Sequence, residues 1–287
     1  MEDFSNILLV TDLDGTFFGE KASLVERNMK AIEYFKAGGG RFTIATGRMH
    51  CNMSKPLPMA KELFNAPIIC CNGALLYDMK TETSIKERMI PGEYGKRIVD
   101  FVAENFRDLG IRVSVPEGFL TSEDMLEAYP KLLRDLNTCD PGKFVIAPRE
   151  TWSNYNWYKL IVRGDPARLD ELRAAIEPLF SRDFDMSKSG ASFFEVQSQG
   201  TTKAAMLDAL REHCEAEAGK RITVWCSGDY ENDLTMLKKA DVAVCPSNAL
   251  NEVKAVCSYC LCHHTEGLMA DIIELIIRQK GGNKTFE

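Results

Sequence analysis

The sequence predicts an α/β fold, with a Rossmann-like parallel-sheet core and an α+β domain inserted into it. Near both ends of the chain, short apolar runs alternate with segments of helical period, which is typical of a parallel sheet covered by helices. Between them, residues 83–190 lack this regular alternation and contain closely spaced strand-like segments instead. The chain has 287 residues, 45% of them hydrophobic and 27% charged, so it is long enough for two such units.

The first part of the predicted core begins with a strand, the continuous apolar run at 7–12, which we expect to be buried on both faces. The helical segment that follows has Ser23 as its expected N-cap and Gly38 at its expected end. Two further apolar runs, at 41–48 and 66–78, each predict one strand.

The same alternation returns after residue 200. The pattern predicts, in order, a helix, a strand, a helix, a strand, a helix, a strand and a closing helix, at 201–219, 221–229, 231–240, 241–249, 251–257, 258–262 and 267–279. The last residues, 280–287, are predicted to be a frayed tail because they are polar and terminal.

The inserted domain is expected to span 83–190, which leaves 1–82 and 191–287 as the two parts of the core. Its pattern predicts strands at 83–90, 111–115, 143–148, 158–164 and 191–197, and helices at 92–106 and 166–180. Four of its aromatic residues are expected either in the core of this domain or at its edge, facing an active site: Trp152, Tyr155, Trp157 and Tyr158.

Composition limits the possible functions. The net charge is −7 (35 Lys and Arg against 42 Asp and Glu), and a net negative charge does not favour binding to nucleic acid or to an anionic membrane. No apolar run reaches the roughly 18 residues of a membrane-spanning helix, and the polar N-terminus is not a signal peptide. With no secretion signal, we expect the ten cysteines to be reduced and the protein to be cytoplasmic. The oligomeric state is left open.

Polar side chains follow several of the predicted core strands. Asp12 and Asp14 follow the first, Thr46, Gly47 and Arg48 follow the second, and a later strand is followed by 228–233, which includes Asp229, Asn232 and Asp233. Lys203 stands near the start of a core helix. Because ligand sites of parallel sheets lie beyond the carboxyl ends of the strands, we expect these side chains to gather at one edge.

A cluster of carboxylates at one sheet edge needs a cation. Like charges repel and raise one another's pKa unless a positive charge lies among them. Mg²⁺ prefers oxygen ligands, keeps several waters and commonly bridges to a phosphate. The sequence therefore predicts Mg²⁺ as the cofactor and a phosphate group as part of the substrate.

Four motifs in this order resemble the haloacid dehalogenase superfamily of phosphatases. They are DLDGT at 12–16, TGR at 46–48, Lys203 within GTTKAAML, and GDYENDLTML at 228–237. The inserted domain resembles the C2-type α+β cap of the Cof-type branch, subfamily IIB, and further similarity to that branch lies at 72–74, 158–166, 246–256 and 266–273. Phe17 and Phe18 depart from the family pattern, where Leu is commoner, without touching the chemistry.

The resemblance implies a role for each motif residue. Asp12 would be the nucleophile that forms an aspartyl phosphate, and Asp14 would be the general acid and base. Mg²⁺ would be held by Asp12, the backbone carbonyl of Asp14 and Asp229, while Asp233 would act mainly through waters. Phosphate would be bound by Thr46, the Gly47 amide, Lys203 and Asn232, and Lys203 would also restrain Asp12. Arg48 would contact substrate or form a structural salt bridge.

The predicted function is hydrolysis of a small phosphate monoester, such as a sugar phosphate, beneath the cap. Three alternatives stay open: a phosphomutase or phosphotransferase of the same superfamily, a switch in which a phosphorylated Asp signals, and an inactive binding relative. A zinc site could also be built from Cys257, Cys260, Cys262, His263 and His264, although a buried strand with structural cysteines is favoured there.

Overall fold

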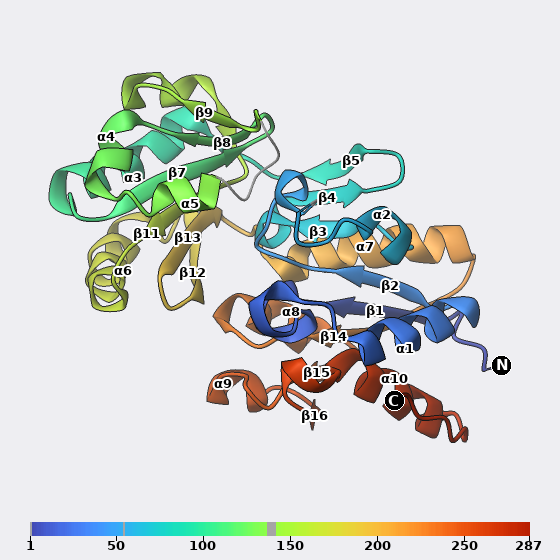
Figure 1. The fold of residues 1–287 in the computed structure, drawn as a ribbon. Coiled ribbons are helices and arrows are strands. Elements are labelled where there is room, and N and C mark those ends of the chain that lie inside the picture. The colour runs from blue at the N-terminus through green and yellow to red at the C-terminus, as the bar shows by residue number, and fades with distance from the viewer. Residues whose placement is uncertain (1, 54, 137–141) are drawn as a thin grey trace.

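Two lobes make up the part of the chain described by the computed structural model, which covers residues 2–53, 55–136 and 142–287 (Figure 1). The first and last thirds of the chain form one lobe, the core, and the middle of the chain forms the other, the cap. In the described residues, every helix is too short or too polar to cross a bilayer.

The core is built on a parallel sheet of five strands in the order β16-β15-β14-β1-β2. These strands are β1 (Ile7–Thr11), β2 (Arg41–Ile44), β14 (Thr223–Ser227), β15 (Val242–Cys245) and β16 (Tyr259–Cys260). Helices flank the sheet: α1 (Glu26–Ala37), α2 (Ala60–Leu63), α7 (Lys203–Ala218), α8 (Leu234–Lys239), α9 (Asn251–Lys254) and α10 (Leu268–Gln279).

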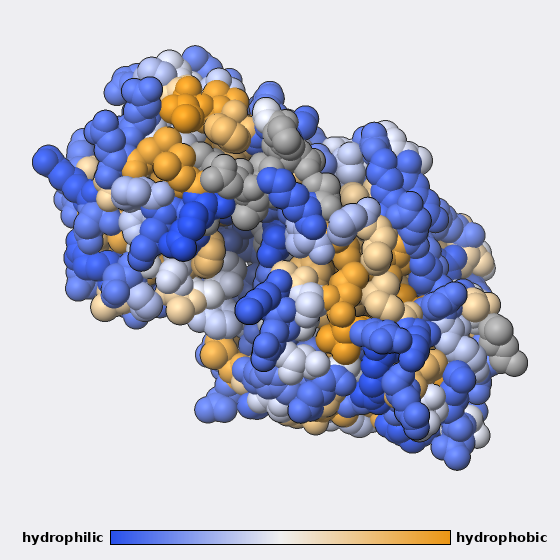
Figure 2. Space-filling view, in the orientation of Figure 1, coloured by the Kyte–Doolittle hydropathy of each residue, from blue (hydrophilic) through white to orange (hydrophobic). Residues whose placement is uncertain are grey.

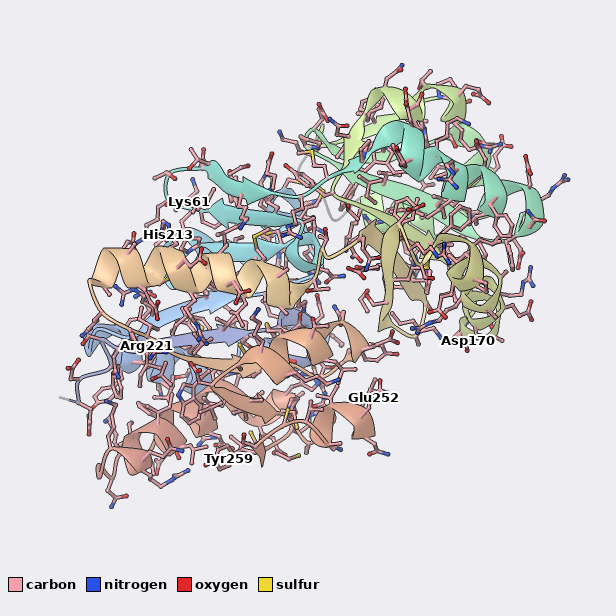
Figure 3. The ribbon with its side chains drawn as sticks, turned by 180° about the vertical axis from the view of Figure 1, so that it is seen from behind. Lys61, Asp170, His213, Arg221, Glu252 and Tyr259 are labelled. Carbon is pink, nitrogen blue, oxygen red and sulfur yellow. The ribbon has the colours of Figure 1, made fainter. Side chains whose placement is uncertain are left out.

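Burial on both faces explains the unbroken apolar run of β1. Ile7 and Leu9 pack into the apolar cluster that includes α1 and α10, whereas Leu8 and Val10 pack into the cluster that includes α7 and α8. Figure 3 shows α7 from behind, with His213 labelled on it, lying along the sheet on that side. The predicted α/β core with helices on both faces is therefore confirmed.

The apolar run at 66–78 contains two strands, and the prediction of a single strand was wrong. The run forms the antiparallel strands β3 (Ile68–Cys70) and β4 (Leu75–Asp78), and β3 continues the core sheet through a bridge between Ala45 and Ile69. Between them the backbone reverses, because Cys71 and Asn72 have positive φ angles of 51° and 54°. The Asn-Gly pair at 72–73 is a hairpin signal that could have indicated this turn.

The cap contains a six-stranded sheet in the order β12-β13-β11-β7-β8-β9 and a separate pair, β6 with β10. Its strands are β6 (Ile90–Pro91), β7 (Gly110–Val115), β8 (Gly118–Thr121), β9 (Phe144–Ile146), β10 (Asn156–Trp157), β11 (Lys159–Arg163), β12 (Phe184–Gly190) and β13 (Phe193–Ser198). Its helices are α3 (Gly92–Asn105), α4 (Glu123–Ala128), α5 (Leu132–Leu136) and α6 (Pro166–Phe180).

Sheet pairing bears on both expected boundaries of the inserted domain. The strand β5 (Thr83–Glu87) pairs with β4 of the core, so the expected start at 83 cuts through a core sheet. β13 pairs with β11 and β12 of the cap, so the expected end at 190 separates two paired cap strands. We therefore propose that the cap spans about 89–198, in place of 83–190, and that the core comprises the residues before and after it.

Three local predictions were wrong. Ser23 lies in a turn in which its carbonyl accepts from Gly19, and α1 begins three residues later at Glu26. The segment at 258–262 is not a buried strand, because β16 is a two-residue edge strand on which Cys260 is exposed. The tail is packed: Phe286 is buried, its amide donates to Glu274 (2.8 Å), and its carbonyl accepts from Arg27 (2.6 Å).

The described cysteines are all free thiols, while Cys139 lies outside the described residues. Of the four cap aromatics, Trp152 and Trp157 lie in the cap core. Tyr158 instead donates to Glu87 (2.7 Å) at the junction with β5. Neither Trp152 nor Trp157 lines the cavity between the lobes, so both lie in the cap core and not at an edge facing that cavity.

Candidate active site

The carboxyl end of β1 places Asp12 at the edge of the core sheet, where the chain leaves the strand in a tight turn. Gly15 in this turn has a φ of +87°, a conformation that side-chain-bearing residues rarely adopt. A Cβ atom there would lie 2.5 Å from a carboxylate oxygen of Asp229. The glycine thus allows the turn after β1 to approach the loop after β14, which carries the second group of carboxylates.

Lys203 joins these two groups from the first residue of α7. Its Nζ lies 2.6 Å from Oδ1 of Asp12 and 2.6 Å from Oδ1 of Asp233, and its side chain is fully buried. Thr202 holds the start of the helix in place by accepting from the amide of Ala205 (3.2 Å). Burial alone would lower the pKa of the Lys203 ammonium, but the carboxylates of Asp12 and Asp233 outweigh this effect and raise the pKa, so Lys203 stays charged.

Asp229 and Asp233 have different environments, although both follow β14. One oxygen of Asp229 accepts from the Thr16 hydroxyl (2.7 Å). Asp233 is fully engaged, because its Oδ1 accepts from Lys203 while its Oδ2 accepts from the amides of Asp229 (2.9 Å) and Tyr230 (3.1 Å). Asp233 therefore shapes the loop, and the expectation that it meets a metal mainly through waters stays a prediction.

The donor set fits a divalent cation. In the described part of the chain, Asp12, Asp229 and Asp233 form the sole cluster of at least three possible metal ligands, with ligand atoms within 4.8 Å of one another. Burial raises the pKa of the Asp12 carboxyl, a shift that Lys203 opposes and the neighbouring carboxylates reinforce. Burial and the charge of Asp233 likewise raise the pKa of Asp229 to about 6. A bound cation would relieve this unfavourable crowding.

Thr46, Gly47 and Arg48 follow β2 and face the same space. The Thr46 hydroxyl accepts from the backbone amide of Arg48 (3.1 Å). The Arg48 guanidinium forms a two-pronged ion pair with Asp14, with distances of 2.7 Å and 2.6 Å. Of the two predicted roles for Arg48, the structure contains the salt bridge, and its partner is the expected general acid.

Asn232 contacts a residue that the sequence analysis did not single out as part of the site. Its side-chain amide donates to Oδ1 of Asn72 (3.1 Å), and the Asn72 amide in turn donates to Glu195 of the cap. Gly73 allows this arrangement, because a Cβ atom there would lie 2.1 Å from the carbonyl oxygen of Thr202. The resemblance at 72–74 pointed to this turn without indicating what the Asn side chain contacts.

A cavity of about 460 Å³ lies between the lobes, above the carboxylates. In the space-filling view, the surface of the molecule is hollowed between the two lobes (Figure 2). Core residues lining the cavity include Asp12, Asp14, Thr46, Gly47, Arg48, Asp229 and Asn232. Cap residues lining it, which sequence reasoning missed, include Arg112, Ser114, Phe119, Lys159, Ser189, Phe193 and Glu195. The structure thus brings the predicted residues together at one edge and closes that edge with the cap.

Residues 9–273 match the family described as haloacid dehalogenase-like hydrolase, which covers both parts of the core and the whole cap. The chain belongs to the haloacid dehalogenase-like hydrolases. Membership confirms the resemblance found in the sequence and favours an enzyme over the Asp-phosphorylated switch and the inactive relative. The cap, which the family match includes, is part of the hydrolase itself.

Relatives of this hydrolase align over nearly its whole length. It is 24% identical to pyridoxal phosphate phosphatase YbhA of Escherichia coli, over 93% of this chain and 97% of that protein. It is 23% identical to 5-amino-6-(5-phospho-D-ribitylamino)uracil phosphatase YwtE of Bacillus subtilis, over 94% and 97%. A solved structure described as a HAD/COF-like hydrolase from Plasmodium vivax has a TM-score of 0.81 and 21% identity, over 96% and 97%. This last likeness supports the Cof-type fold.

The region at 257–264 contains no zinc cluster among the residues that the structure describes. His263 and His264 instead take part in local contacts, with Thr265 (2.9 Å) and with the carbonyl of Phe18 (2.5 Å) respectively. Cys260 contacts the carbonyl of Pro246 at 3.9 Å. The contacts are local, and the structural role expected for the three cysteines stays a prediction.

Proposed function

We propose that this hydrolase is a Mg²⁺-dependent phosphatase that cleaves small phosphate monoesters through an aspartyl-phosphate intermediate. The observation that carries the proposal is the placement of Asp12, which faces the cavity while Lys203 holds one of its oxygens. A carboxylate restrained in this way can present its other oxygen to phosphorus. The two curated relatives, both named phosphatases, support the same reaction.

In the proposed reaction, the core residues position the phosphoryl group for attack by Asp12. Thr46, the Gly47 amide and Asn232 would donate to phosphoryl oxygens, and Lys203 would contribute positive charge beneath them. Asp12, the carbonyl of Asp14 and Asp229 would hold Mg²⁺, which supplies charge that stabilises the phosphoryl oxygens. The remaining work of the protein is to orient groups and to keep bulk water out under the cap.

Asp14 would protonate the leaving oxygen and later draw a proton from the attacking water. Its ion pair with Arg48 fixes the direction of its carboxyl group at the cavity wall. Each oxygen of Asp14 keeps a second lone pair, so the leaving oxygen of a substrate can approach the carboxyl beside the guanidinium. We propose that Arg48 then shifts toward the substrate, so that its two predicted roles belong to two successive states.

The substrate is proposed to be a small phosphorylated metabolite. The cavity of about 460 Å³ suits a ligand of sugar-phosphate size, and the cap leaves no room for a folded phosphoprotein. Its cap wall combines the guanidinium of Arg112, the hydroxyls of Ser114 and Ser189, and the rings of Phe119 and Phe193. This mixture suits a polar leaving group with one apolar face. We also propose a cytoplasmic location, where such metabolites occur.

The decisive experiment is a screen of phosphorylated metabolites with Mg²⁺, scored by kcat/KM and by release of inorganic phosphate. Sugar phosphates and phosphorylated cofactors such as pyridoxal phosphate should be included. The proposal expects hydrolysis of at least one of them with kcat/KM of about 10⁴ M⁻¹s⁻¹ or higher. Transfer of the phosphoryl group to a second sugar hydroxyl, without phosphate release, would favour the mutase alternative instead.

Substitution of Asp14 by Asn should reduce the rate unequally across substrates. A sugar alkoxide needs a proton as it leaves, and general acid catalysis of this kind is worth about 10²–10⁴-fold. Nitrophenolate leaves without a proton, so the single-turnover burst with nitrophenyl phosphate should lose far less. The burst is the right measurement because Asp14 also activates water in the second step. An equal loss for both substrates would show that Asp14 is not the acid.

Mg²⁺ affinity should fall as the pH decreases through about 6. The ligand is the ionised carboxylate, and the pKa of Asp229 is raised to about 6 by burial and by Asp233. Below pH 6 the affinity should drop about tenfold per pH unit for each competing proton. Calorimetric titrations from pH 5 to 8, in buffers of different ionisation enthalpy, measure both affinity and proton release. A flat profile across this range would contradict the prediction.

A further inference from the structure

A buried ion pair of the cap reaches into the core beside the phosphate-binding residues. Lys159 on β11 and Glu195 on β13 are 2% and 3% exposed, and their charged atoms lie 2.7 Å apart. The proposed reaction assigns neither of them a role. Both line the cavity, and both make hydrogen bonds that cross from the cap to the core.

Lys159 fixes one peptide group of the core from the cap side. Its ammonium donates to the carbonyl of Gly47, while the amide of the same peptide group, on Arg48, donates to the Thr46 hydroxyl (3.1 Å). The peptide plane is therefore held at both ends. Since the Thr46 oxygen accepts this hydrogen bond, its own hydrogen is directed elsewhere, and Thr46 faces the cavity.

Glu195, directly beside Lys159, acts in the same way on Asn72. One of its oxygens accepts from both Lys159 and the side-chain amide of Asn72, and the other accepts from Ser189 (2.6 Å). The Asn72 oxygen in turn accepts from Asn232 (3.1 Å). This contact fixes which way the Asn232 amide is turned, and one of its two hydrogens is left to donate into the cavity.

We propose that Lys159 and Glu195 are positioning residues that complete the phosphate-binding site when the cap docks on the core. Through Gly47 and Asn72 they orient the two neutral donors, Thr46 and Asn232, toward one phosphoryl group. Cap docking and phosphate binding are then coupled, because each orders the groups that the other needs. The inference deepens the proposed phosphatase function and rests on it.

The test uses four variants. One is a double variant that carries both Lys159→Met and Glu195→Gln and so keeps the net charge unchanged. The others are the two single variants and the matched control Lys96→Met. Lys96 is also a cap lysine in an ion pair, with Asp100 (2.6 Å), on a helix away from the cavity. The double variant avoids leaving one buried charge without its partner. Thermal unfolding verifies that each variant is folded. The readouts are kcat/KM for nitrophenyl phosphate, kcat/KM for the best metabolite of the screen, and calorimetric affinity for inorganic phosphate with Mg²⁺.

The expected result is a loss of about 10–100-fold in kcat/KM that is similar for both substrates, with weaker binding of inorganic phosphate and no change in Lys96→Met. The effect should also depend on Thr46. In a Thr46→Val background, adding Lys159→Met should cost less than about threefold, because the donor through which Lys159 acts is already gone.

Three outcomes would overturn the inference. A loss confined to the metabolite, with phosphate affinity intact, would make Lys159 and Glu195 leaving-group contacts. A lowered Tm with unchanged kinetics would show that the two residues only stabilise the contact between the lobes. Native protein that neither binds phosphate nor hydrolyses any ester would remove the proposed function, and the inference with it. In the first two outcomes the proposed function stands, so the two failures are distinguishable.

Discussion

Asp12→Asn should abolish turnover of every substrate, with a loss of at least about 10⁴-fold, while the protein stays folded. An amide cannot attack phosphorus, and removal of a nucleophile costs this much in enzymes that form covalent intermediates. The fold should tolerate the change for two reasons. Burial already disfavours the ionised form of Asp12, and Lys203 keeps its contact with Asp233.

The measurement is single-turnover phosphate release together with mass spectrometry of acid-quenched protein. Native protein mixed with substrate should carry a phosphoryl group on the peptide that contains Asp12, and the variant should not. Asp100→Asn is the matched control, because Asp100 lies on the cap helix α3 and pairs only with Lys96 among the described contacts. Near-normal rates in Asp12→Asn would show that the phosphoryl group never resides on this residue.

Complete removal of divalent metal should lower turnover by about 10³-fold or more, and Mg²⁺ should restore it. The carboxylates of Asp12 and Asp229 lie within one buried cluster, and without a cation they repel both each other and an incoming phosphate. A bound metal contributes several kcal/mol to transition-state stabilisation, which corresponds to this factor. Ca²⁺ should restore little activity, because it is larger and prefers more ligands.

Metal content should be verified by elemental analysis before each assay. Asp229→Asn should raise the Mg²⁺ concentration needed for half-maximal rate. Glu252→Gln should not raise it, because Glu252 is an exposed carboxylate on α9, labelled in Figure 3, outside the cluster. Undiminished turnover in excess EDTA, after removal is verified, would mean that Lys203 and the backbone amides suffice to stabilise the phosphoryl group.

The structure separates two kinds of carboxylate that sequence spacing could not distinguish. Asp229 and Asp233 both follow β14, and the motif alone makes them equivalent candidates for metal ligation. Only the hydrogen bonds show that both oxygens of Asp233 are already in use, by Lys203 and by two backbone amides. The resemblance implies different roles for the two residues, and these hydrogen bonds leave Asp229 the freer carboxylate of the two.

The sequence by itself determined the core sheet, its helices and the place of the site. These features follow from local rules: an apolar run of the right length makes a buried strand, and polar residues at its carboxyl end lie at a shared sheet edge. Asp12, Thr46, Asp229 and their neighbours therefore meet where the motifs predicted. The same local rules explain two errors. Ser is common both at helix N-caps and in turns, so Ser23 alone could not mark the start of the helix. The apolar run at 66–78 hid the turn that divides it into two strands.

Only the tertiary structure decided which residues complete the site from the cap and which act through others. Lys159 and Gly47 are 112 residues apart in the chain, and Asn72 and Glu195 are 123 apart. The packing of Phe286 on Tyr34 likewise joins the end of the chain to α1. Sequence periodicity constrains neighbours within an element, whereas these contacts depend on how the two lobes and the chain end pack together. Their residues therefore carry no local pattern, and only their positions in space reveal their partners.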